Sequence, residues 1–523
     1  MGVSSSSSIT SMEAETLLKW KASLHNTTQT LLSSLWVGSN HCNWVGITCD
    51  STRSVTSITL RGTLDNLSFF YFPNLIWLQL RNNTLYGHIP WHIGNLSKLI
   101  FLDLSFNNFS GSIPSEICLL KSLQLISLES NEISGPIPRD IGSLSSVSNI
   151  GFHGNNLSGT IPSSIGRLHN LSYLDLGWNR LNGSIPKQVG MLRSLCLLDF
   201  SGNSLTGSVP PSIGNLSNLQ FLYFYGNHLS GSLPSEIGLL KSLSALQLLG
   251  NNLSGVIPSS IANLTNLFSL MLDENAFSGP LPRDIGMLKS LNLLSLADNS
   301  NSGSIPASIG NLTILSGLFL GGNSLTGHIP QTYTCGDQQQ FDGPIPSSLR
   351  DCKSLTRVRL EGNHFTGNIS DAFGIYPNLV YIGLSHNNFF GELSPKLGQG
   401  PRLTSLRFSN NNISGKIPFE LADATQLGEL DLSSNHLIGE IPKELGTLKM
   451  MSRLFLSGNQ LSGKNPSEIG LLSNLEQLNL ASNNLSGPIP GNLGNCSKLF
   501  NLNFSKNDLG ESIRSSISDI IAL

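Results

Sequence analysis

Two arginines in the segment LTRVRLEGN, Arg357 and Arg359, are the side chains best suited to recognition chemistry in this chain. If the segment is a strand, both side chains leave the same face, because successive residues of a strand point to opposite sides. Two parallel guanidinium forks can hold a carboxylate bidentately, and Arg407 would add a further cation on this face. The alternative is a set of local salt bridges with nearby carboxylates: Glu361, Glu429 and Asp431.

A second candidate set combines large, mostly aromatic side chains with carboxylates and lies between residues 153 and 319. Elsewhere, the strand positions that face solvent mostly carry Ser, Gly, Asp or Asn. Exposed aromatic residues on neighbouring strands are typical of binding surfaces, so we predict that this set binds a ligand. The alternative is that large residues occur here because they favour strands. The set comprises His153, Tyr173, Trp178, Phe221, Tyr223, Tyr225, Met271 and Phe319, with the carboxylates Asp175, Asp199 and Asp273.

Motifs of catalysis and metal binding are missing from the sequence. It contains no H-E-x-x-H zinc motif, no P-loop and no group of Cys and His at metal-ligand spacing. The charge is nearly balanced, with 30 Lys and Arg against 33 Asp and Glu, which gives no case for nucleic acid or an anionic membrane surface. We therefore predict a binding protein without catalytic activity, metal or cofactor.

The element that positions these side chains is a repeat of 24 residues, in which an asparagine such as Asn107 or Asn131 marks each copy. Its frame is LxxLxLxxNxLxGxIP, as in LIFLDLSFNNFSGSIP from Leu99 to Pro114. The LxL alternation predicts a strand with one buried face, and stacked copies predict a parallel sheet. The repeat is that of a plant-type leucine-rich-repeat solenoid. We expect an α/β fold of about 19 to 20 coils with the sheet on the concave face.

Four segments are expected along the chain. Residues 1–12 form a disordered N-terminal segment, and residues 13–54 form a cap that begins with the amphipathic stretch EAETLLKWKASL. The solenoid covers 55–510, and 511–523 form a truncated last coil without a C-terminal cap. The period breaks once, at 324–342, where QTYTCGDQQQ offers no LxL strand. We expect an irregular, shortened coil there.

Cys42 and Cys49 bracket CNWVGITC in the cap and are expected to form a disulfide, because the open apolar end of the first coil needs a cover. A reduced pair is the alternative. Disulfides persist in oxidising compartments, so this pair predicts an extracellular protein.

Glycosylation sequons agree with secretion, although the repeat itself generates many of them, and we expect only some to carry sugar. The candidate acceptors are Asn66, Asn82, Asn95, Asn108, Asn156, Asn170, Asn182, Asn215, Asn252, Asn263, Asn311, Asn368, Asn412 and Asn484.

The GxIP segment, the 24-residue period and the cap EAETLLKWKASL followed by CNWVGITCD resemble the ectodomains of plant leucine-rich-repeat receptor-like kinases. Over nearly the whole chain the likeness is to the male-discoverer-interacting receptor-like kinase group, through segments such as RVRLEGNHFTGNIS. The RxR pair is similar to the one with which HAESA-type receptors hold the free carboxyl end of a peptide. That resemblance implies the same role for Arg357 and Arg359.

The resemblance further implies a receptor on the extracellular face of the plasma membrane that binds a secreted peptide or protein. It also implies recruitment of a co-receptor kinase ectodomain as a second partner. The chain departs from this family because the sequence has no visible signal peptide, membrane span or kinase signature, and it ends part-way through a coil. We expect a fragment or a truncated gene product, with membrane contact only through segments absent from this chain. The alternative function is a secreted inhibitor of a cell-wall-degrading enzyme, similar to polygalacturonase-inhibiting proteins.

Overall fold

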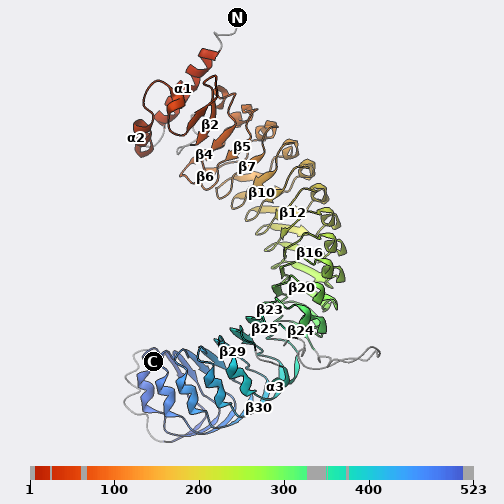
Figure 1. Cartoon of the computed structure of the whole chain (residues 1–523), viewed down its shortest axis with the longest axis vertical. Coiled ribbons are helices and arrows are strands. Elements are labelled where there is room, and N and C mark those ends of the chain that lie inside the picture. Colours follow the sequence, from red (N-terminus) through yellow and green to blue (C-terminus); the bar gives the residue numbers. More distant parts are fainter. Residues whose placement is uncertain are drawn as a thin grey trace. The chain divides into compact units, whose positions relative to one another are not determined.

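The computed structural model describes residues 6–23, 26–59, 67–326, 349, 352–372 and 376–510. The chain divides into two compact units, residues 1–253 (unit 1) and 254–523 (unit 2), and each is described by itself. Both consist of coils that repeat one pattern (Figure 1). A first strand of three residues is followed by a second strand and then by a turn of 3-10 helix. One such coil in unit 1 contains β15 (Phe221–Tyr223), β16 (His228–Ser232) and η9 (Ser235–Leu239).

The cap of unit 1 consists of helices α1 (Ser6–Ser23) and α2 (Asn26–Leu35) and the antiparallel strands β1 (Ile47–Cys49) and β2 (Val55–Thr59). Leu17 and Trp20 of α1 are fully buried, and the ring of Trp20 lies 6.1 Å from that of Trp36. The Glu13 carboxylate is buried and accepts hydrogen bonds from Ser54 Oγ at 2.6 Å and from the Val55 amide. These contacts fix α1 on the first coil.

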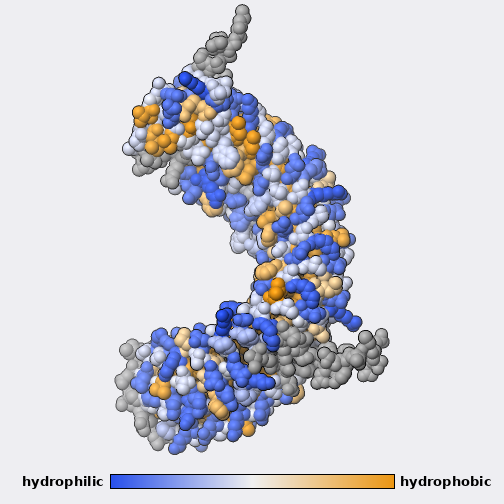
Figure 2. All heavy atoms as spheres, viewed as in Figure 1, coloured by the Kyte–Doolittle hydropathy of each residue, from blue (hydrophilic) through white to orange (hydrophobic). Residues whose placement is uncertain are grey.

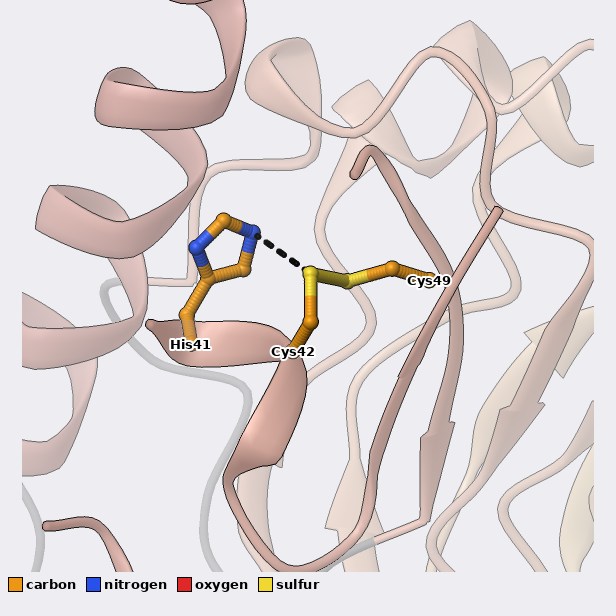
Figure 3. A group of neighbouring side chains, drawn as sticks. All are labelled: His41, Cys42 and Cys49. Atoms are coloured by element: carbon orange, nitrogen blue, oxygen red, sulfur yellow. Dashed lines mark hydrogen bonds between the residues drawn. A yellow bond between two sulfur atoms is a disulfide. The ribbon is translucent and has the colours of Figure 1, made fainter. Parts of the chain in front are cut away.

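Cys42 and Cys49 are bonded to each other, which confirms the predicted disulfide (Figure 3). The Nε2 atom of His41 lies 3.7 Å from Cys42 Sγ (Figure 3) and 3.5 Å from Oε2 of Glu13 on α1. The expected boundary at residue 13 is wrong for the helix, which begins at Ser6. Once the packing of Leu17 and Trp20 holds the helix, each further residue toward the N-terminus adds a backbone hydrogen bond without a new nucleation cost.

The first strands pair in parallel from β2 onward and build the sheet predicted from the repeat; with β1, the described residues contribute twenty strands to it. In unit 1 the helical turns lie on the opposite, convex side (Figure 1). The first strands of unit 1 are β3 (Trp77–Gln79), β5 (Phe101–Asp103), β7 (Leu125–Ser127), β9 (Asn149–Gly151), β11 (Tyr173–Asp175), β13 (Leu197–Asp199), β15 and β17 (Ala245–Gln247). Those of unit 2 are β19 (Ser269–Met271), β21 (Leu293–Ser295), β23 (Gly317–Phe319), β25 (Arg357–Arg359), β27 (Tyr381–Gly383), β29 (Ser405–Arg407), β31 (Glu429–Asp431), β33 (Arg453–Phe455), β35 (Gln477–Asn479) and β37 (Asn501–Asn503).

Second strands form narrower parallel sheets beside the first. In unit 1 they are β4 (Tyr86–His88), β6 (Asn108–Ser110), β8 (Ser134–Pro136), β10 (Asn156–Thr160), β12 (Arg180–Ser184), β14 (Ser204–Gly207) and β16, and β18 (Asn252–Gly255) contains the boundary. In unit 2 they are β20 (Ala276–Pro280), β22 (Ser300–Gly303), β24 (Ser324–Leu325), β26 (Thr366–Asn368), β28 (Asn388–Glu392), β30 (Asn412–Gly415), β32 (His436–Gly439), β34 (Gln460–Lys464), β36 (Asn484–Gly487) and β38 (Asp508–Leu509). A short helix, α3 (Ile369–Ala372), follows β26.

The repeated asparagine joins neighbouring coils through backbone groups that the strands leave unpaired. Asn203 donates from Nδ2 to the carbonyls of Leu176, Phe200 and Ser201 at 3.0 to 3.1 Å, and its Oδ1 accepts from the Leu181 amide at 2.9 Å. The side chain is buried, so these four bonds satisfy groups that water cannot reach. The same arrangement recurs along both units and sets the spacing of the first strands.

The shortened coil expected at 324–342 lies mostly outside the described residues, which stop at 326 and resume at 349. β23 pairs directly with β25, and the Oδ1 of Asn363 accepts from the Leu325 amide at 2.9 Å. Between Asn323 and Asn363 the sheet of first strands therefore advances by one strand, from β23 to β25. The physical reason is that the segment between them lacks the LxL pair that a strand of this sheet requires. Residues 327–348 and 511–523 lie outside the described residues, and so does the truncated last coil predicted at 511–523.

Candidate ligand-binding surfaces

Arg357 and Arg359 project from the same face of β25, as the alternation predicted, and the residue between them is buried. Both side chains are exposed. The guanidinium carbon of Arg359 lies 5.9 Å from the centroid of the Phe319 ring on β23 and 5.0 Å from that of Tyr381 on β27. Arg359 is thus flanked by a ring on each side, which restricts its guanidinium by cation–π contact.

Tyr381 also binds Glu361, the carboxylate nearest to these arginines in sequence. Its hydroxyl donates to Oε1 of Glu361 at 2.7 Å across the backbone of Gly383. A Cβ placed on Gly383 would overlap that carboxylate oxygen and lie 2.9 Å from the hydroxyl. Burial, and next the bond to Glu361, raises the pKa of Tyr381 to about 12, so the phenol remains protonated and able to donate.

The salt-bridge alternative describes Arg407 but not the RxR pair. Arg407 Nη2 lies 2.8 Å from Oε1 of Glu429, and Arg453 reaches the same oxygen at 3.8 Å. Among the described residues, neither Arg357 nor Arg359 forms an ion pair. The two arginines of β25 are therefore the ones whose charge is available to a ligand.

In unit 1 the predicted aromatic set gathers on β11 and β15 and on the residues that follow them. Tyr173, Phe221, Tyr223 and Tyr225 are half-buried, and the rings of Phe221 and Tyr223 lie 6.1 Å apart. Trp178 is exposed by 56% and has a φ of +52°, so its indole stands beside the strand ends. These residues form a ring-bearing surface on β11 and β15, which lie on either side of β13 and pair with it in register.

A polar group lies beside these rings and centres on His153. Its Nδ1 is 3.3 Å from Oδ1 of Asp175, whose other oxygen accepts from the Tyr173 hydroxyl at 3.3 Å. The bond to Asp175 raises the pKa of His153 against the opposing effect of burial, and burial raises the pKa of Asp199. Ligand atoms of His153, Asp175 and Asp199 lie within 4.8 Å of one another, a spacing that could hold a cation. One oxygen of Asp199 is already engaged by the amide and hydroxyl of Ser201.

Three predicted residues lie in unit 2 and are not part of this surface. Met271 and Phe319 are half-buried on β19 and β23, and Phe319 is the ring that flanks Arg359. Asp273 is buried and accepts from the Ser295 hydroxyl and from the Ala297 amide, which gives it a structural role between coils. The predicted set thus divides between the two units.

Aromatic residues at two places on the solvent-facing side of the first strands were not predicted from the sequence. Tyr381 lies at the same distance before its repeat asparagine as Tyr173, so the criterion that identified Tyr173 should have identified Tyr381 as well. Trp77 and Phe101 occupy this place in unit 1 and stack with ring centroids 3.6 Å apart. Phe101 and Tyr173, with Glu129 and others, line a hollow of about 300 Å³. Glu129 is half-buried there, and its pKa is raised by burial and then by Asp175.

Most sequons lie where an enzyme could reach them. Figure 2 shows mainly hydrophilic side chains on the visible face of each unit, with apolar ones in small patches. Asn66 lies outside the described residues, and Asn156 and Asn368 are half-buried. The remaining candidate asparagines are exposed: Asn82, Asn95, Asn108, Asn170, Asn182, Asn215, Asn252, Asn263, Asn311, Asn412 and Asn484. No helix in the described part of the chain combines the length and apolar character that a membrane crossing requires.

Family models match most of the solenoid and the cap. Residues 10–50 match the leucine rich repeat N-terminal domain, and residues 226–324 match a leucine-rich repeat region. Eight further stretches match single leucine rich repeats: 98–120, 122–144, 170–192, 194–216, 402–424, 426–448, 451–472 and 474–496.

Curated relatives match over short segments. A probable leucine-rich repeat receptor-like protein kinase of Arabidopsis thaliana is 37% identical over 107 residues, 18% of this chain and 9% of the relative. MDIS1-interacting receptor like kinase 2 of the same plant is 40% identical over 100 residues, 18% of this chain and 10% of the relative. The matched segments therefore span about a tenth of the length of these relatives.

Solved structures match over nearly the whole chain. The plant peptide hormone receptor RGFR1, in complex with RGF2, has a TM-score of 0.81 and 31% identity over 92% of this chain and 85% of that chain. The Arabidopsis receptor kinase HAESA, in complex with the peptide hormone IDA and the co-receptor SERK1, has a TM-score of 0.79 and 32% identity over 98% of this chain and 88% of that chain.

Proposed function

We propose that this chain binds a secreted peptide with the solvent-facing side of its first strands. The chain belongs to the family of plant leucine-rich-repeat receptor ectodomains. RGFR1 and HAESA are both described in complex with a peptide hormone, and this chain resembles them over most of its length. The observation that carries the proposal is the pair Arg357 and Arg359, two exposed guanidinium groups on one strand without an ion-pair partner among the described residues.

The RxR pair would hold the free carboxyl end of the peptide. Two guanidinium groups leaving the same face can each donate to a carboxylate, and charge-assisted bonds of this kind are stronger than neutral ones. The flanking rings of Phe319 and Tyr381 support this role, because they limit the orientations of Arg359 before the ligand arrives. Arg407 would assist from the next coil but one, although its charge is shared with Glu429.

We propose the ring-bearing surface of unit 1, taken by itself, as a second peptide-binding surface. Tyr173, Phe221 and Tyr223 offer large, half-exposed rings that gain by covering apolar side chains. Asp175 and Asp199 would supply polar contacts beside them, with His153, Trp178 and Tyr225 at the border. In unit 2, Met271 would take part from its own strand.

We further propose that the protein acts on the extracellular face of the plasma membrane and recruits a co-receptor kinase ectodomain. The Cys42–Cys49 disulfide and the exposed sequons support an oxidising, secretory route. The presence of SERK1 in the HAESA complex supports a co-receptor, since this chain resembles HAESA over 98% of its own length. The binding role requires no catalytic group of the chain itself.

The test uses the secreted chain and a library of random peptides displayed with free carboxyl ends. A selected peptide is synthesised with a free and with an amidated terminus, and its Kd is measured by calorimetry. Changing Arg357 and Arg359 to Ala should weaken the free peptide at least about tenfold, because bonds to a charged group contribute roughly 1.5 to 3 kcal/mol each. Arg193→Ala, at an exposed position outside the first strands, is the matched control.

The amidated peptide should bind the unmodified chain about as weakly as the free peptide binds the double variant. Its Kd should change little when both arginines are replaced. If free and amidated peptides bind equally well to the unmodified chain, the arginines do not recognise a carboxylate. Failure to select any peptide would contradict the peptide-binding proposal as a whole.

A further inference from the structure

We propose that Tyr381 is a positioning residue that holds the Glu361 carboxylate away from the arginines of β25 and so leaves their charge available for a ligand carboxylate. This inference deepens the proposed function and rests on it for the identity of the ligand group. The observation behind it is the 2.7 Å hydrogen bond from the Tyr381 hydroxyl to Glu361 Oε1.

Glu361 is the carboxylate closest to the pair in sequence. It follows Arg359 by two residues, so its side chain leaves the same face. An unrestrained carboxylate at this distance along an exposed strand is attracted to the guanidinium beside it. Such an internal pair would compete directly with a ligand. The structure instead turns Glu361 toward the next coil.

Gly383 makes this turn possible. In the sheet Tyr381 pairs with Arg357, and Gly383 pairs with Arg359. The phenol and the Glu361 carboxylate meet above Gly383, where any side chain would occupy the same space. A glycine at this one position of β27 therefore opens the path between the two groups.

The ring of Tyr381 positions the guanidinium groups as well. Arg359 lies 5.0 Å and Arg407 5.8 Å from its centroid, and these two arginines pair with Gly383 from opposite neighbouring strands. The ring thus contacts both cations while its hydroxyl holds the anion. Because the raised pKa of Tyr381 keeps the hydroxyl protonated, the arrangement persists across the physiological pH range.

Arg407 shows what happens where no phenol restrains the carboxylate. Its neighbour Glu429 accepts from the Ser405 hydroxyl at 2.8 Å with one oxygen and pairs with Arg407 at 2.8 Å with the other. The guanidinium is thereby neutralised within the chain. Arg359 and Arg407 lie at the same register position of the sheet, and of the two only Arg407 forms an ion pair with another described residue. We attribute this difference to the hydrogen bond from Tyr381 to Glu361.

The experiment uses Tyr381→Phe, which keeps the ring and removes only the donor. The probes are one library-selected peptide in its free and amidated forms, and phenylglyoxal, which modifies accessible arginines. We expect Tyr381→Phe to weaken the free peptide about fivefold or more, because Glu361 then pairs with Arg359. The amidated peptide should be unaffected. The rate of phenylglyoxal modification at Arg359, followed by mass spectrometry, should fall.

Three further variants separate positioning from a general structural effect. Adding Glu361→Gln to Tyr381→Phe should restore both the affinity for the free peptide and the modification rate. Gly383→Ala should reproduce the loss, and Tyr86→Phe, at an exposed tyrosine of unit 1, should change neither readout. Equal losses for free and amidated peptides, or no rescue by Glu361→Gln, would overturn the inference.

The modification rate does not depend on a peptide. If the unmodified chain fails to distinguish free from amidated peptide while the rate at Arg359 follows the variants as described, the carboxylate-binding proposal fails and the positioning role of Tyr381 stands. If the rate at Arg359 is the same in all variants, the positioning role is overturned, whatever the peptides show.

Discussion

The imidazole Nδ1 of His153 lies 3.3 Å from Oδ1 of Asp175 on the neighbouring first strand of unit 1. The carboxylate favours the protonated imidazole, and the pKa of His153 is raised above its ordinary value of 6.5. Glu129, Asp175 and Asp199 are the acidic groups that face this imidazole, and the pKa values of Glu129 and Asp199 are raised as well, mainly by burial. His153, Glu129 and Asp199 therefore hold their protons more tightly in the folded chain than in the unfolded one.

This cluster should accordingly add stability to unit 1 as the pH falls, against the opposite effect of His92, whose pKa burial lowers. The contribution of His153 is fully present below pH 6.5 and is lost as the pH rises through its higher folded-state pKa. The raised pKa values of Glu129 and Asp199 act in the same direction, because these carboxyl groups also stabilise the fold less once the pH rises above their ordinary pKa range. We expect the apparent melting temperature to fall between about pH 6 and pH 8, and His153→Gln to reduce this fall. His436→Gln, at an exposed position of unit 2, is the control; an unchanged pH dependence in His153→Gln would contradict the assignment.

The repeat frame predicted on which face of the sheet each side chain lies. It did not predict which side chains contact one another on that face. Alternation alone placed Arg357, Arg359 and Glu361 on one face, because the pattern has a period of two. Which carboxylate binds which cation depends on residues one coil away. Tyr381 reaches Glu361 only because Gly383 leaves space, and nothing in the period of the repeat records that space.

The contact between Phe319 and Arg359 has a similar origin. Phe319 and Arg359 are forty residues apart in sequence, yet they are direct partners in the sheet. Asn323 and Asn363 are 40 residues apart, which is not a multiple of 24, so a constant 24-residue step loses the frame of every later repeat. Pattern reasoning is therefore reliable within a run of regular coils and fails where the chain between two strands changes length.

Adjacent leucines of one helical turn should differ sharply in their contribution to stability. Leu240 is fully buried, whereas Leu239 is exposed by 56%. We expect Leu240→Ala to lower the free energy of unfolding by about 2 to 5 kcal/mol, through lost burial and the cavity left behind. Leu272→Ala, a fully buried position beside β19, should cost as much. Leu239→Ala should remain within about 0.5 kcal/mol in denaturant unfolding, and similar costs for Leu239 and Leu240 would contradict the register.

The cap should loosen before the coils when its disulfide is removed. Cys42 and Cys49 close a short loop that contains β1, and a disulfide across a loop of this size contributes roughly 2 to 3 kcal/mol. In the double Cys→Ser variant we expect faster amide exchange in β1 and β2 and unchanged exchange in β35, measured by mass spectrometry. Equal acceleration in all three strands would mean that the disulfide supports the whole chain and not only the cap.

Two coils of unit 2 bury an asparagine where the repeat usually places an aliphatic residue. Asn301 is fully buried, and its Nδ2 donates to Asn323 Oδ1 at 3.0 Å while its own Oδ1 has no partner in the described structure. Asn465 is 7% exposed, and within the described residues neither amide atom forms a hydrogen bond. A buried amide without partners costs about 1 to 3 kcal/mol, and an aliphatic side chain there would gain by burial.

Asn465→Ile should therefore stabilise unit 2 by about 1 to 3 kcal/mol in denaturant unfolding. Asn301→Leu should stabilise it less, because it also removes the bond to Asn323, although Asn323 Oδ1 still accepts from the backbone amide of residue 301 at 2.9 Å. Asn203→Leu is the matched control and should destabilise, since all four bonds of that amide would be lost. A loss of stability in Asn465→Ile would show that its amide has a partner in solution and is not a buried, unpaired group.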